Sequence, residues 1–172
     1  MKFKVLIALS VLLSFSACKK TQETEAEVQT EVTDVLELSE KNIAKFKYIE
    51  YALDVKTEKA IEDWQEYFQL ETVINNVKKA DLAFFYDNDK NIVTLLKDLK
   101  KEIPKEVDSD ATMARIVALE TYLYKLKSLS NLDTTDKQEL LLSVKDFLIS
   151  FSNLNFQMNQ KIEADNINIS RP

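Results

Sequence analysis

Cys18 is the only cysteine among the 172 residues, so its thiol is the one soft nucleophile in the sequence. A single cysteine excludes an intramolecular disulfide and a multi-thiolate metal site. The sequence also has no histidine, the commonest general acid–base group, and no glycine, which phosphate-binding loops and nucleophile elbows require. We therefore expect a protein that is not an enzyme and that holds no cofactor and no metal.

The residues that precede Cys18 have the pattern of an export signal. Lys2 and Lys4 are followed by an apolar stretch over residues 5–15 that only two serines interrupt. As a helix this stretch measures about 16 Å, against the ~30 Å of a bilayer's hydrocarbon, so it is too short to span and the right length for a signal. With small residues at positions 16 and 17, the end of the stretch resembles the lipobox of bacterial lipoproteins.

This resemblance implies that residues 1–17 are a signal peptide that is removed and that the thiol of Cys18 becomes the lipid anchor. Each buried methylene contributes about 0.8 kcal/mol, so two or more acyl chains make membrane attachment effectively permanent. Lys19, rather than an aspartate, follows the cysteine. By resemblance to enteric lipoprotein sorting, this implies the outer membrane, at its periplasmic face or at the cell surface. The alternatives are an ordinary secretory signal and an uncleaved N-terminal anchor.

The charge balance indicates which partners to exclude. The chain has 23 Lys and Arg residues against 29 Asp and Glu, a net charge of −6, and loss of residues 1–17 makes it two charges more negative. An acidic chain without a basic stripe does not neutralise phosphates, so we exclude nucleic acid as a partner. Residues 18–38 are rich in Glu and Thr and are predicted to be a flexible, disordered tether with a reach of about 25 Å.

Four stretches between residues 57 and 165 have apolar residues at helical spacing, which predicts a helical bundle. Pro104 ends the second predicted helix, and Ser109 or Asp110 caps the third. Thr135, with Gln138 three residues later, matches a capping box for the fourth. The prediction is an all-α fold, an antiparallel up-and-down helical bundle of about four helices, with a frayed C-terminus over residues 166–172.

Residues 39–56, which precede the predicted bundle, have a different pattern. Ile49, Tyr51, Leu53 and Val55 alternate with less apolar residues, which is the period of an extended chain. Because no second run of this kind follows, we expect an extended strap packed along the helices, with a short helix as the alternative.

Two aromatic groups are the other candidate sites. The first is Trp64 with Tyr67 and Phe68, and the second is residues 84–86, Phe-Phe-Tyr. Each could form a pocket or a partner-binding patch, although core packing is favoured at this spacing. Phe85 is the residue we expect to be partly exposed. Asp87, Asn88, Asp89 and Asn91 superficially resemble the start of a calcium loop, but the glycine and the glutamate of such a loop are absent, and helix capping explains these residues better.

Together these features favour a lipid-anchored envelope protein whose helical domain is a non-catalytic protein-interaction module. Its partners would be the membrane, through the lipid on Cys18, and an unknown envelope protein. The alternative is a carrier that holds a small apolar ligand in a bundle cavity of about 300 Å³ or more.

Overall fold

A computed structural model describes residues 38–167, and all regular secondary structure within that range is helical. The all-α class is therefore confirmed. The predicted signal peptide, Cys18 and nearly all of the predicted tether lie outside the described residues, as do the last five residues. The elements are α3 (Glu40–Ile43), α4 (Val55–Ala60), α5 (Gln65–Lys78), the 3-10 helix η2 (Ala83–Phe85), α6 (Asp89–Lys101), α7 (Asp110–Ser130) and α8 (Lys137–Asn166).

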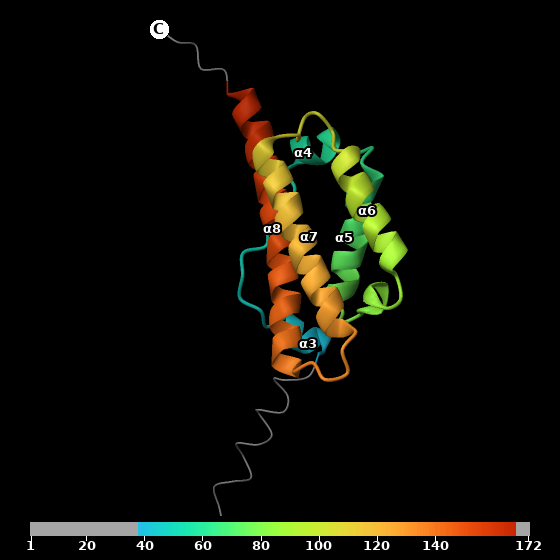
Figure 1. The fold of residues 1–172 in the computed structure, drawn as a ribbon. Helices are drawn as coiled ribbons and strands as arrows, with labels where there is room; N and C mark the ends of the chain where they lie inside the picture. Colours follow the sequence, from blue (N-terminus) through green and yellow to red (C-terminus); the bar gives the residue numbers. More distant parts are fainter. Residues whose placement is uncertain (1–37, 168–172) are drawn as a thin grey trace, which may run out of the picture. The chain divides into compact units, whose positions relative to one another are not determined.

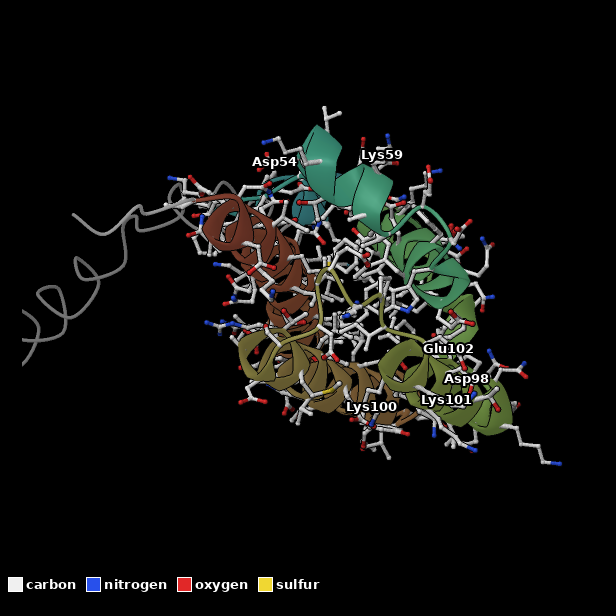
Figure 2. The ribbon with its side chains drawn as sticks, turned by 90° about the horizontal axis from the view of Figure 1, so that it is seen from above. Asp54, Lys59, Asp98, Lys100, Lys101 and Glu102 are labelled. Atoms are coloured by element: carbon white, nitrogen blue, oxygen red, sulfur yellow. The ribbon has the colours of Figure 1, made fainter. Side chains whose placement is uncertain are left out.

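The four longer helices, α5 to α8, lie side by side, and successive ones run in opposite directions (Figure 1). α7 and α8 pack against each other most extensively, and α6 packs against both α5 and α7. Figure 2, a view from above, shows Asp54 and Lys59 on one side and Lys100 and Glu102 of the α6 end on another. Both α3 and α4 pack against α8. None of the described helices is long and apolar enough to cross a bilayer.

The core consists of one apolar cluster to which every long helix contributes. On α7 the buried residues are spaced three and four apart, as the amphipathic pattern predicts. Burial of this apolar surface is the main force that holds the helices together, at roughly 25 cal/mol per Å². The largest fully buried side chains are Trp64, Tyr67, Phe85, Phe147, Ile61, Leu70, Ile74, Ile92, Leu96, Leu99, Ile116 and Leu119.

The first of the four predicted helical stretches covers residues 57–85, where the apolar spacing predicts one long helix, and this prediction is wrong. The chain leaves the helix after Ala60 and again after Lys78. At the second break the N–H of Asp81 donates to Asn76 O (3.0 Å) and the N–H of Ala80 donates to Val77 O (2.9 Å). These two bonds form a Schellman motif, and they place Ala80 at φ 63°. Glycine usually fills this left-handed position, so its absence from the sequence concealed the helix end.

The predicted helix starts are confirmed at α7 and wrong by one residue at α8. Ser109 caps α7, since its Oγ accepts from Thr112 N (3.1 Å). At α8 the cap is Asp136, whose Oδ1 accepts from the N–H groups of residues 138 (2.8 Å) and 139 (3.2 Å). Thr135 instead donates to Leu129 O (2.7 Å), so the predicted capping box does not form. A carboxylate is well suited to this cap because the helix dipole favours negative charge there.

Candidate functional site

Within residues 39–56, for which an extended strap or a short helix was predicted, residues 46–54 contain no helix or strand. Hydrogen bonds hold this shorter segment along α8, and from here on the name strap refers to residues 46–54. Ser152 accepts from Tyr51 N (2.8 Å) and donates to Ile49 O (2.8 Å). One turn later, Asn155 Nδ2 donates to Tyr51 O (3.1 Å). The α8 side chains thus bind the backbone of the strap, as a neighbouring strand would in a sheet.

A third α8 side chain extends this arrangement to the end of the strap. Asn159 Nδ2 donates to Ala52 O (2.8 Å), and its Oδ1 accepts from Asp54 N (3.0 Å). Residues 152, 155 and 159 are three and four positions apart, so they lie on one face of α8. One edge of the strap is therefore occupied by α8.

Asn155 also joins the strap to α5. Its side chain is buried, with 6% of the residue exposed, and its Oδ1 accepts from the Tyr67 hydroxyl (2.9 Å). Tyr67 is fully buried. Burial raises the pKa of the Tyr67 phenol well above its ordinary value of 10.0, and the carboxylate of Glu71 raises it further. The phenol therefore keeps its proton well above neutral pH, and its hydroxyl remains a donor to Asn155.

The opposite edge of the strap has free backbone groups. Within residues 38–167, no hydrogen bond engages the backbone N–H or C=O of Glu50 or of Leu53. Successive residues of an extended chain direct these groups to opposite sides. Tyr51 and Ala52 both bond to α8, so this alternation is broken between them. On either side of the break it places the backbone groups of Glu50 and Leu53 on the edge away from α8.

A hollow of about 570 Å³ lies between the strap and α5, and we call it the strap groove. Its lining includes the apolar side chains of Leu53, Phe68, Ile74 and Phe151. Phe68 is only half-buried, so the groove has an aromatic surface in contact with solvent. The remaining lining residues are Glu50, Tyr51, Ala52, Glu58, Glu71, Asn75, Lys78 and Asn155.

The strap groove is negatively charged. It is lined by three carboxylates and one amine, and the amine of Lys78 forms an ion pair with Glu50. Among the residues that the structure describes, Glu58 and Glu71 have no ion-pair partner. Both of them raise the pKa of Tyr67, so their field extends into the domain beneath the groove. A positively charged group that bound in the groove would be attracted by these two carboxylates.

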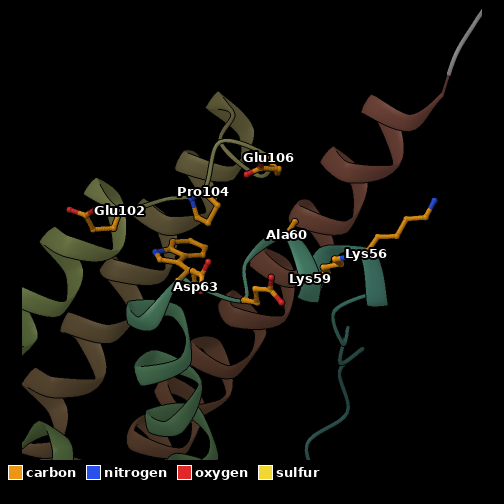
Figure 3. Close-up of a pocket in the computed structure, with 9 residues that line it drawn as sticks. Lys56, Lys59, Ala60, Asp63, Glu102, Pro104 and Glu106 are labelled. Carbon is orange, nitrogen blue, oxygen red and sulfur yellow. The ribbon is translucent and has the colours of Figure 1, made fainter.

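A second hollow, of about 620 Å³, lies between α4 and the segment that follows α6 (Figure 3). Its charged residues are of both signs, with two amines and four carboxylates. They are Lys56, Lys59, Glu62, Asp63, Glu102 and Glu106. Trp64 also lines it, with a buried Nε1 that has no partner among the described residues. No cluster of carboxylates in the described part of the chain could hold a metal ion. This hollow lacks the aliphatic floor of the strap groove, since its aliphatic lining is limited to Ala60 and Pro104.

The predicted aromatic sites are for the most part core. Trp64 and Tyr67 are buried and stack on each other, whereas their neighbour Phe68 lines the strap groove. The prediction that Phe85 is partly exposed is wrong, because η2 turns its side chain into the core, where it packs edge-on against Phe147 (ring centroids 6.0 Å apart).

The side chains that organise the groove were missed in the sequence. Ser152, Asn155 and Asn159 interrupt the apolar pattern of α8 at helical spacing, which is the signal that could have identified a polar face. At residues 87–91, Asn88 occupies the cap position of α6, but its side chain makes no capping bond and donates instead to Phe84 O (3.1 Å).

No family model, curated protein or solved structure matches this chain.

Proposed function

We propose that this chain is a lipid-anchored protein of the bacterial cell envelope whose helical domain, an antiparallel up-and-down bundle of four helices, binds another envelope protein and catalyses no reaction. The strap groove is the observation that supports this proposal. It combines a half-buried aromatic ring, aliphatic side chains and free backbone groups, which are features of protein-binding surfaces. The lipid on Cys18 would hold this surface at the outer membrane, on its periplasmic face or at the cell surface.

The acidic composition supports a protein partner over nucleic acid. The groove also lacks the groups that catalysis would need. The carboxylates of the groove are exposed or half-exposed, and the sequence supplies no histidine or second cysteine to act beside them.

Site-specific photo-crosslinking in the native cell envelope tests this function. A photoreactive amino acid in place of Asn75, an exposed residue that lines the groove, should give a discrete crosslinked protein. The same amino acid in place of Val93, which is 54% exposed on α6, is the matched control. Crosslinking from position 75 alone would support the proposal. Absence of any product from position 75, or the same products from both positions, would contradict it.

The second candidate function is a carrier of a small apolar ligand. The volume of the strap groove falls within the range of small-molecule sites, which is about 300–1,000 Å³. An apolar ligand, however, would have to desolvate the carboxylates of Glu58 and Glu71 without pairing them, and this is costly. Release of a bound apolar molecule by organic extraction of the purified protein, detected by mass spectrometry, would favour the carrier.

A further inference from the structure

We propose that the partner of the strap groove is an extended polypeptide segment that carries Lys or Arg residues around an apolar residue, and that it docks as an added strand along the free edge of the strap. This inference rests on the proposed function and specifies the chemistry of the partner. Three independent features of the groove lead to it.

The first feature is the pair of free backbone positions in the strap. The N–H and C=O groups of Glu50 and Leu53 are unbonded within residues 38–167, while the other edge of the strap is held by α8. A chain edge with unpaired backbone groups is a template for another extended chain. In a regular strand, the residues that bond along one edge are two positions apart, whereas Glu50 and Leu53 are three apart because Tyr51 and Ala52 both bond to α8. The strap therefore has a bulge at residues 51 and 52, which the added strand would pass.

The second feature is the wall that faces this edge. α5 contributes Phe68, Ile74 and Asn75, and α8 contributes Phe151 to the floor. A groove between an extended segment and a helix gives an incoming strand backbone bonds on one side and a pocket for alternate side chains on the other. Residues 50–53 span about 13 Å at roughly 3.3 Å per residue, so the groove accommodates a segment of about four residues.

The third feature is charge. Glu58 and Glu71 line the groove without ion-pair partners among the described residues, and Glu50 is 57% exposed despite its pairing with Lys78. A basic segment would complement these carboxylates, whereas a second copy of this acidic chain would bring mostly like charge to them. The complementarity therefore selects a basic partner over self-association.

Fluorescence anisotropy with the full chain in mild detergent tests this proposal. The probe is a labelled peptide, Lys-Val-Lys-Leu-Lys, compared with Glu-Val-Glu-Leu-Glu. We expect the basic peptide to bind and the acidic one not to bind, with affinity that falls as salt is added. Glu71→Gln should weaken binding about fivefold, whereas Asp133→Asn, in the exposed loop before α8, should leave it unchanged.

Backbone recognition is tested with two N-methylated versions of the basic peptide. One is methylated at its lysines and the other at Val and Leu, so that each lacks the N–H donors of one edge. One of the two should bind at least about tenfold more weakly than the parent peptide. Equal binding by both, or by the basic and acidic peptides, would overturn the proposal.

The remaining outcomes separate this inference from the proposed function. If no peptide binds but position 75 still crosslinks a partner in the envelope, the inference fails and the proposed function stands. If neither occurs, both fail. Self-association of the chain that Glu71→Gln alters, without peptide binding, would assign the groove to a second copy and would also overturn the inference.

Discussion

Replacement of Asn155 by alanine should destabilise the domain more than any other single change to a polar residue of the strap interface. The substitution leaves the hydroxyl of Tyr67, a fully buried donor, without its acceptor. An unsatisfied buried donor costs about 1–3 kcal/mol. The backbone carbonyl of the half-buried Tyr51 also loses its hydrogen bond from Asn155 Nδ2. Water can replace this donor, so the loss costs only about 0.5 kcal/mol. The expected loss in the free energy of unfolding is therefore about 1.5–3.5 kcal/mol.

The matched control is Asn159→Ala, the same substitution one turn later on α8. Asn159 also binds the strap backbone, but its bonds are exposed and water replaces them, so the expected loss is under about 1 kcal/mol. Urea unfolding followed by circular dichroism measures both variants. The fluorescence of Trp64, whose ring lies 5.7 Å from that of Tyr67, reports the same region.

A double-mutant cycle makes this prediction specific to the hydrogen bond. Tyr67→Phe removes the donor, so adding it to Asn155→Ala should cost little more than Asn155→Ala alone. We expect a coupling free energy of about 1–2 kcal/mol between the two sites. Additive losses, or a loss at Asn155 no larger than at Asn159, would refute the role assigned to the buried bond.

Three further predictions follow from individual residues. Ala80→Gly should raise the free energy of unfolding by about 1 kcal/mol in urea, because Ala80 has φ 63°, whereas Ala118→Gly in the interior of α7 should lower it by about 1 kcal/mol. Burial raises the pKa of the Tyr67 phenol above 10.0, so the unfolded chain deprotonates first and the free energy of unfolding falls as pH rises above 10. Tyr67→Phe should flatten that fall in unfolding measured between pH 9 and pH 12, and an unchanged slope would contradict the shift. Cys18→Ser should release otherwise normal protein from the membrane fraction of cells, and unchanged retention would count against lipidation.

The helices that the sequence predicted best are those whose whole length packs against the core. In α7, Ile116, Leu119, Leu123 and Leu126 follow one stripe, and the pattern determines both the helix and its buried face. The breaks around Ile61 and after Lys78 were missed because the apolar spacing continues across them. Residues on both sides of each break face the same core, so the spacing of apolar residues in the sequence does not change where the helix axis changes direction.

The groove could not be predicted from local patterns. Its two walls come from the strap and α5, and the side chains that hold the strap are about 100 residues later in the chain. The alternation in Tyr51 and Leu53 indicated an extended segment, but no strand follows for it to pair with. The strap pairs instead with amide and hydroxyl side chains of α8. In the sequence, these side chains cannot be distinguished from ordinary polar residues on the solvent face of a helix.

Amide hydrogen exchange across the strap tests most directly whether a partner docks along its free edge. In the free protein, the N–H group of Tyr51 is bonded to Ser152 of α8 and should exchange slowly, while those of Glu50 and Leu53 should exchange quickly. With saturating Lys-Val-Lys-Leu-Lys peptide, we predict that exchange at Glu50, Leu53 or both slows by at least about tenfold. Fast exchange at both residues in the presence of bound peptide would contradict strand addition in the strap groove.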